Sequence, residues 1–281
     1  MSEQAKLTTV EAVRQLRADP RYAAVVRDAY LEEDSRAAAE RFSRSAEFAE
    51  VRALLGGRLR GGTVVDLGAG TGIASYALAR AGARLVYALE PDAGEVGRAA
   101  IESLAGDLPI ELLDAFGERI PLADCEVDVI YARQVLHHTR DLRAVLAECA
   151  RVLRRGGLLL VCREHVADDE RQLAQFLAEH PIHRLAGGEH AYPLAAYVSA
   201  IEAAGLRIER TLDPWDSVIN AFPTVRSREE LSRFPQRVLG ERFGLAGRLA
   251  GFVPGVRAAA WKRIRRHPVP GRHYSFLAVK P

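Results

Sequence analysis

The chain has 281 residues, of which 48% are hydrophobic, and 39 Lys and Arg against 37 Asp and Glu give it a formal net charge of +2. A charge so close to zero gives the whole molecule no nucleic-acid-binding footprint, and no apolar run has the length of a bilayer. The three cysteines are scattered without a C-x-x-C pair, which favours a reducing compartment over a disulfide framework. Because the chain also opens on polar residues without an apolar signal segment, we expect a cytoplasmic protein.

The first 56 residues predict a helical cap. Helices are expected over residues 9–17, 21–31 and 34–55, with Thr8 or Thr9 and Asp34 as their starts. In the third helix, Phe42 and Phe48 are expected to pack on the core. Arg41 or Arg44 could instead lie near the carboxylate of a ligand, and this alternative stays open.

From residue 63 onward, strands and helices alternate. Strands are expected at residues 63–67, 84–89, 109–113, 127–132 and 158–163, and helices at 72–81, 92–104 and 141–153. This alternation predicts an α/β fold with a doubly wound, mostly parallel sheet. Ligands bind such sheets at the carboxyl ends of the strands, near the point where the strand order reverses.

The last third of the chain is less regular. Helices are expected at 168–179 and 193–204, and strands at 206–212 and 273–279. Residues 213–272 separate these two strands, and because a structureless loop of that length is uncommon, we expect two or three short helices there. The predicted organisation is a cap (1–56), a core (57–212 and 273–281) and a helical insertion (213–272) that serves as an acceptor lid.

A glycine-rich turn follows the first buried strand. Gly68, Gly70 and Gly72 let the backbone turn sharply and approach a ligand, and the next helix begins directly after them. Glu90 ends the following strand, about 20 residues past the turn, where a carboxylate can bind both hydroxyls of a ribose. The glycines alone are a weak signal, but their combination with Glu90 is specific.

These residues resemble the motifs of the class I S-adenosylmethionine (SAM)-dependent methyltransferases. The segment Val64-Val65-Asp66-Leu67-Gly68-Ala69-Gly70-Thr71-Gly72 resembles the family's motif I, and Glu90-Pro91-Asp92 resembles its ribose site. Asp114-Ala115-Phe116 resembles the adenine site, and residues 128–138 and 153–160 resemble the motifs around the fourth and fifth strands.

The resemblance covers residues 61–162. It implies a Rossmann-like sheet of seven strands, in which the seventh runs antiparallel beside the fifth. It also implies SAM as the cofactor and S-adenosylhomocysteine as the product. With Arg133, which ends the fourth strand, the expected cofactor-binding residues are Asp66, Gly68, Ala69, Gly70, Gly72, Glu90, Pro91, Asp114, Ala115 and Arg133.

Histidines and carboxylates follow the fourth and fifth strands, where the transferred methyl group should be exposed. His137 and His138 come after the fourth strand, and one of them could act as a general base or merely pack beside the cofactor. After the fifth strand, Glu164-His165, His180-Pro181-Ile182-His183 and Gly187-Gly188-Glu189-His190 form a second set. These side chains could deprotonate an acceptor, hold a divalent metal, or only cap helices and line a wet loop. Because their spacing matches no metal motif, we predict a metal-free acceptor pocket with His137, His165, His183 and Glu189 as catalytic candidates.

Residues 226–272 are rich in basic side chains, most densely at 262–267. This segment could bind an anionic acceptor, a phosphorylated glycan or a membrane surface, but a solvated helix face is the preferred interpretation. Phe252, Val253 and Trp261 could form a dimer contact or an acceptor wall.

We therefore predict a methyltransferase that acts on a small-molecule acceptor, most simply by O-methylation of a sugar, glycan or secondary metabolite. The alternatives are an N- or C-methyltransferase, or a SAM-binding cyclase, isomerase or binding protein that transfers no methyl group. A nucleic-acid-modifying enzyme is disfavoured, since residues 131–134 are Tyr-Ala-Arg-Gln and not an Asn-Pro-Pro-Tyr-like motif. The expected partners are the acceptor and a second copy in a homodimer, with no nucleic acid and no membrane span.

Overall fold

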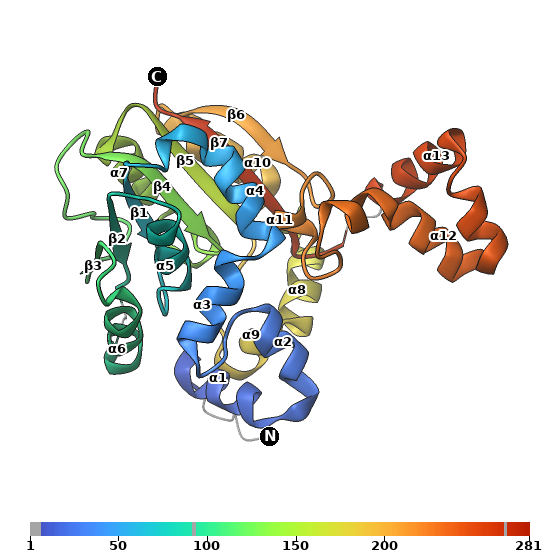
Figure 1. The fold of residues 1–281 in the computed structure, drawn as a ribbon, viewed down its shortest axis with the longest axis horizontal. Helices are drawn as coiled ribbons and strands as arrows, with labels where there is room; N and C mark the ends of the chain where they lie inside the picture. The colour runs from blue at the N-terminus through green and yellow to red at the C-terminus, as the bar shows by residue number, and fades with distance from the viewer. Residues whose placement is uncertain (1–6, 92–93, 267–268) are drawn as a thin grey trace.

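A seven-stranded sheet forms the centre of the computed structural model, which describes residues 7–91, 94–266 and 269–281 (Figure 1). Its order is β3-β2-β1-β4-β5-β7-β6. The strands are β1 (Thr63–Leu67), β2 (Leu85–Leu89), β3 (Ile110–Leu113), β4 (Val127–Arg133), β5 (Leu153–Val166), β6 (Arg207–Leu212) and β7 (Arg272–Val279). β1 to β5 are parallel, and β7 runs antiparallel between β5 and β6, which confirms the predicted topology. Asp92 and His267 of the predicted motifs lie outside the described residues.

Helices cover both faces of the sheet, so the central strands are apolar on both sides, and every residue of β1 is buried. One face packs against α3 (Ser35–Ser43), α4 (Ala46–Leu55), α5 (Ile73–Arg80) and α11 (Val218–Ala221). The other packs against α7 (Leu142–Val152) and α10 (Leu194–Ala203). α6 (Gly94–Ala105) lies beside α5.

The helices of the N-terminal cap are interrupted more often than predicted. The capping box of Thr8 and Glu11 starts α1 (Thr9–Ala18) as expected. The predicted helix over 21–31 is a 3₁₀ turn followed by the shorter α2 (Ala23–Asp28).

The single helix predicted over 34–55 is wrong, because Ser45 starts a new helix there. Its hydroxyl accepts the N–H of Phe48 at 3.0 Å and caps α4. The break lets Phe42 and Phe48 pack together in the core, with ring centroids 5.3 Å apart, as predicted for these two residues.

A lobe below the sheet combines the N-terminal helices with α8 (Glu170–Glu179) and α9 (Pro181–Ala186) (Figure 1). α9 lies in a segment for which no helix was predicted. The N–H of Leu7 donates to the carbonyl of Leu185 at 3.1 Å, and α1 contacts α9. The segment after β5 is therefore held against the start of the chain.

An arm projects from the side of the molecule (Figure 1). It contains α12 (Arg228–Ala250) and α13 (Pro254–Arg265), and we call residues 226–266 the arm. α12 spans 23 residues but is divided at Gly244, where φ is 63° and ψ is −148°, into a long helix before this residue and a short one after it. The prediction of short helices was therefore wrong for the first part of α12. The ring of Trp215 stacks on that of Phe234, with the ring centroids 4.4 Å apart, and this contact fixes the base of the arm. In the described part of the chain, no helix is long and apolar enough to span a membrane.

Candidate functional site

The glycine turn lies between β1 and α5. The N–H groups of Gly68 and Ala69 donate to the carbonyl of Leu89 at 2.9 and 3.0 Å, which joins the turn to β2. A Cβ on Gly68 would lie 2.6 Å from a methyl carbon of Val135, whereas a Cβ on Gly70 would meet nothing within 4 Å. Gly68 is therefore required by packing, while the turn keeps open space beside Gly70.

Two of the predicted carboxylates lie side by side at the carboxyl ends of β2 and β3. The N–H of Glu90 donates to the carbonyl of Leu113 at 3.0 Å, and its carboxylate accepts the N–H of Gly70 at 2.8 Å. Asp114 follows Leu113, is exposed, and forms an ion pair with Arg98 at 3.2 Å. Pro91 and Ala115, which follow these two carboxylates, are half-buried.

Asp66 is buried under the glycine turn. Its carboxylate accepts a 2.6 Å hydrogen bond from the Ser75 hydroxyl, which links β1 to α5. Burial raises the pKa of Asp66 to about 7, although the hydrogen bonds from Ser75 act in the opposite direction. The Asp66 side chain thus joins the two elements on either side of the glycine turn.

Arg133, at the end of β4, forms a nearly buried ion pair with Glu47 of α4. Its Nε lies 2.7 Å from the Glu47 carboxylate, and its guanidinium lies over the rings of Tyr30 and Phe42. Burial favours the neutral form, but the Glu47 charge and hydrogen bond prevail and hold the pKa of Arg133 above its usual value. Arg133 therefore joins the cap to the sheet, and its contact with a cofactor stays a prediction.

A buried carboxylate organises the loop after β4. Glu164 accepts the backbone N–H groups of Val135, Leu136 and His137 at 3.0 to 3.1 Å. It also lies 2.6 Å from Nδ1 of the His137 ring, and both side chains are buried. Burial opposes the charge of Glu164, but His137 and these N–H groups hold the pKa of its carboxyl below the usual value.

Glu189 brings a second carboxylate to the same place. One oxygen lies 3.6 Å from Nε2 of both His137 and His138, and the other lies 3.8 Å from Nδ1 of His180. Gly187 and Gly188, both with positive φ, form the turn that presents it. We call His137, His138, Glu164, His180 and Glu189 the His–Glu cluster.

The two carboxylates control the charge of the cluster. Burial alone would lower the pKa of His137, but Glu164 and Glu189 raise it to about 9, so this imidazole carries a proton at neutral pH. The neighbouring histidines hold the pKa of Glu189 at about 2 against the effect of its burial. Burial and the charge of His137 lower the pKa of His138, which is therefore neutral.

The remaining catalytic candidates lie beside the cluster. The His165 ring is 4.9 Å from that of His137, its Nδ1 donates to the carbonyl of Gly271, and burial lowers its pKa to about 3. His183 lies on α9, and its backbone N–H donates to Nδ1 of His180 at 3.4 Å. His180 was not selected from the sequence, although Pro181 at the first helical position could have marked it as a helix cap facing the loop.

Comparisons with known proteins agree with this geometry. Residues 65–161 match the family described as "Methyltransferase domain". A dimethylglycine N-methyltransferase of Parasynechococcus marenigrum is 33% identical over 62% of this chain and 61% of that protein. A ubiquinone biosynthesis O-methyltransferase of Rhizobium etli is 30% identical over 53% of this chain and 62% of that protein.

Residues 65–161 of this chain form a SAM-dependent methyltransferase domain. The structure of a SAM-dependent methyltransferase from Mesorhizobium loti shares its fold, with a TM-score of 0.56 and 18% identity over 84% of this chain and 98% of that one. The chain spans about three fifths of the length of the two curated relatives, so their activities are properties of those proteins.

SAM is the cofactor of this methyltransferase family, and the residues at the carboxyl ends of β1 to β3 fit it. The glycine turn leaves room beside Gly70 for a ligand to approach the backbone. The Glu90 carboxylate lies directly against the Gly70 N–H, at the edge of that space.

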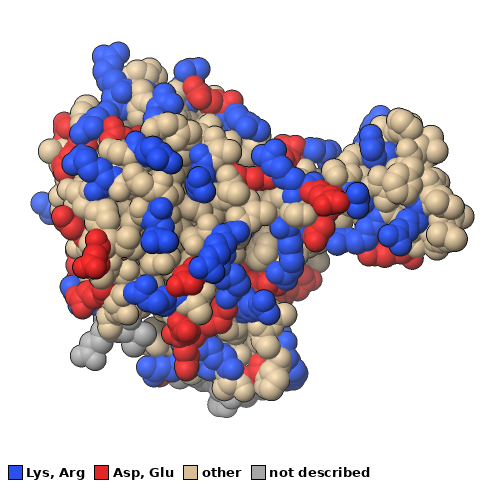
Figure 2. All heavy atoms as spheres, viewed as in Figure 1, with Lys and Arg blue, Asp and Glu red and all other residues tan. Residues whose placement is uncertain are grey.

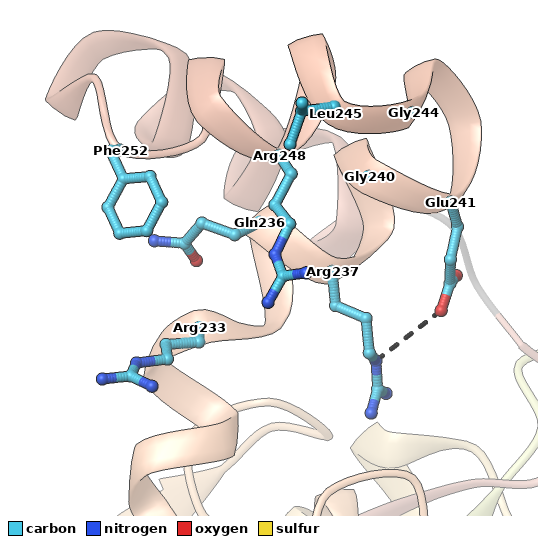
Figure 3. Close-up of a pocket in the computed structure, with 9 residues that line it drawn as sticks. All are labelled: Arg233, Gln236, Arg237, Gly240, Glu241, Gly244, Leu245, Arg248 and Phe252. Carbon is cyan, nitrogen blue, oxygen red and sulfur yellow. Dashed lines mark ion pairs between the residues drawn. The ribbon is translucent and has the colours of Figure 1, made fainter.

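A different cavity, of about 790 Å³, lies within the arm and outside the matched domain (Figure 3).

The shifted pKa of Asp66 predicts a pH dependence of stability. The folded-state pKa of about 7 lies above the unfolded value, so this group stabilises the fold most at low pH and loses that contribution as pH rises from about 4 to 7. Asp66→Asn removes the titration. We expect the unfolding free energy of the wild type to fall relative to that of the variant by about 4 kcal/mol across this window. Urea denaturation at several pH values measures the difference, and a constant gap between the two proteins would contradict the assignment.

Proposed function

We propose that this methyltransferase transfers the methyl group of SAM to a hydroxyl oxygen of a small acceptor that lies against the His–Glu cluster. The donor site is formed by the glycine turn with Glu90 and Asp114. Glu90 binds the ribose hydroxyls, Asp114 and Ala115 lie at the adenine, and Asp66 supports the turn from below. These roles follow the resemblance to the family and the placement of the side chains at one edge of the sheet.

One observation carries the proposal: Val135 contacts both halves of the site. A Cβ on Gly68 of the donor turn would collide with the Val135 side chain, and the Val135 N–H donates to Glu164 of the cluster. The cluster is therefore held directly beside the donor turn. An acceptor bound there would be adjacent to the donor, and alignment of the reactants supplies most of the catalysis in such a transfer.

The cluster can accept the proton of a hydroxyl acceptor. Bound SAM supplies an electrophilic methyl group, so the acceptor must be aligned and, if it is a hydroxyl, must lose a proton. In the metal-free site, the neutral imidazole of His138 provides a proton acceptor at this position. A tertiary alkylamine is largely protonated at neutral pH and must lose that proton before it can attack the methyl group, so the same groups would serve such an acceptor, and turnover assays decide between the two classes.

The narrower acceptor class stays a prediction. The two relatives are named for dimethylglycine and for ubiquinone biosynthesis, so they support methylation of small molecules without favouring a sugar or glycan. The lid role of residues 213–272 also stays a prediction. Two members of the cluster, His180 and Glu189, come not from that insertion but from the segment between β5 and α10.

Calorimetric titration with SAM tests the donor site. Glu90→Ala removes both the ribose contact and the acceptor for the Gly70 N–H, and we expect it to weaken SAM binding at least about tenfold. Glu111→Ala is the matched control, since Glu111 is exposed within β3, away from the carboxyl edge. Equal affinities in all three proteins would contradict the assignment of Glu90.

The acceptor is tested by measuring S-adenosylhomocysteine formation with a panel of hydroxylated compounds and tertiary amines. We expect turnover with a hydroxylated acceptor. Turnover confined to tertiary amines would contradict O-methylation, while SAM binding without turnover of either class would favour a SAM-binding protein of another activity.

A further inference from the structure

The ligand atoms of the His–Glu cluster have the spacing of a metal site. Nε2 of His137 and Nε2 of His138 both lie 3.6 Å from one oxygen of Glu189, and the chelating atoms of the three residues lie within 4.8 Å of one another. Hydrogen bonds between nitrogen and oxygen are shorter, at about 2.7 to 3.2 Å. A tetrahedral zinc ion bound at 2.0–2.1 Å separates its ligand atoms by about 3.3 Å. The two nitrogen–oxygen distances to Glu189 are thus too long for good hydrogen bonds and close to the spacing that a cation imposes.

Glu164 holds the His137 ring in the way that a carboxylate behind a metal-binding histidine holds its imidazole. It holds Nδ1 at 2.6 Å, so that Nε2 faces Glu189. Histidines that bind metals commonly donate their other N–H to a carboxylate, which fixes the ring and raises its basicity. Three backbone N–H groups hold Glu164 itself in place.

We propose that His137, His138 and Glu189 bind one divalent transition-metal ion of the zinc type, which takes the place of the proton on Nε2 of His137. Three protein ligands leave a position for an oxygen of the acceptor, as in catalytic zinc sites. This role in orienting the acceptor rests on the proposed methyl transfer, whereas binding of the ion does not. The inference replaces the metal-free pocket predicted from the sequence, because ligands at 137, 138 and 189 form no local sequence motif.

The test uses the full chain after removal of metal by a chelator. Titration with Zn²⁺ in a calorimeter should give one site, and Co²⁺ should give the visible absorption bands of a tetrahedral complex. Glu189→Gln and His138→Ala should each weaken Zn²⁺ binding at least about 100-fold, since each removes a direct ligand. His190→Ala, in the same loop but outside the cluster, is the matched control and should bind Zn²⁺ like the wild type.

Two outcomes overturn the metal site: no stoichiometric binding of Zn²⁺ or Co²⁺, or unchanged binding by Glu189→Gln. Titration of the same metal-free protein with SAM separates this failure from that of the proposed function. SAM binding without metal binding rejects the ion and keeps the donor site, whereas loss of both in folded protein rejects both.

The charge of the arm supports a second inference that does not depend on the metal site. Residues 226–266 contain eleven Arg and Lys but three Glu, a net charge of +8, so the rest of the chain carries −6. Large apolar side chains are exposed on the same element, among them Leu245 at 72%, Phe252 at 64% and Leu249 at 60%. Scattered single apolar residues are ordinary on a surface, but a group of them at the end of a basic projection marks an interaction site.

The close-up of the arm shows how the two kinds of side chain lie together. Phe252 lies to the left of Arg248 and Leu245 lies above it, with Arg233 and Arg237 below, around the cavity in the bend of α12 (Figure 3). The space-filling view shows the arm standing clear of the body, with basic side chains along it and an end without charged side chains on this face (Figure 2). A flat surface could therefore reach the end of the arm without colliding with the sheet.

We infer that the arm docks on the surface of an anionic lipid bilayer. Its apolar end would enter the boundary between headgroups and acyl chains, and its Arg and Lys side chains would face the anionic headgroups. A net charge of +8 on a projecting element complements such a surface, while the acidic remainder of the chain is repelled by it. This docking requires no membrane-spanning helix.

Co-sedimentation with vesicles tests the docking. We expect the wild type to sediment with vesicles that contain phosphatidylglycerol, not with pure phosphatidylcholine, and to lose at least about tenfold in affinity when salt rises from 0.05 to 0.5 M. The double variant Leu245→Ser, Phe252→Ser should lose the binding. Val10→Ser with Val25→Ser is the matched control, because these apolar residues are also exposed but lie in the N-terminal helices.

Absence of binding to anionic vesicles, or equal binding by the Leu245 and Phe252 variant, overturns the inference. Analytical ultracentrifugation of the same proteins identifies the competing occupant. A wild-type dimer that the double variant converts to a monomer, without vesicle binding, would assign the arm to a second copy of this chain.

Discussion

The structure of the site depends on one buried charge, the Glu164 carboxylate at the end of β5. A carboxylate removed from water costs several kcal/mol unless it is paired and hydrogen-bonded. Here the N–H groups of residues 135–137 and the His137 imidazole surround it. Because these partners all belong to the loop after β4, burial of one side chain fixes that loop, the orientation of His137 and the contact of Val135 with the donor turn.

The donor half of the site could be predicted from the sequence because its residues are local. Gly68, Gly70 and Gly72 are contiguous with a buried strand, and Glu90 follows at the end of the next one, so strand order alone brings them together. The structure also confirms the antiparallel strand beside β5, which was predicted from the family resemblance. Hydrophobic patterning fixes a strand buried on both faces, and the rules of strand connection leave few arrangements of such strands.

The acceptor half could not be predicted, because it depends on tertiary contacts and on local breaks in regular structure. Arg163 has a φ of 62°, and the pairing of β5 with β7 shifts between Val161 and Glu164. Such a bulge re-aims the side chains that follow it, here including Glu164, and nothing in the alternation of residues marks it. The helix break at Ser45 and the placement of His180 beside Glu189 likewise depend on packing between distant segments.

Hydrogen exchange in Glu164→Gln tests the organising role of this carboxylate most directly. A neutral amide accepts fewer and weaker hydrogen bonds than a carboxylate. We expect the backbone N–H groups of residues 135–137 to exchange at least about tenfold faster in the variant, while those of β1 keep their protection. Unchanged exchange at residues 135–137 would contradict this organising role, and equal acceleration in β1 would show that Glu164 supports the whole sheet and not this loop.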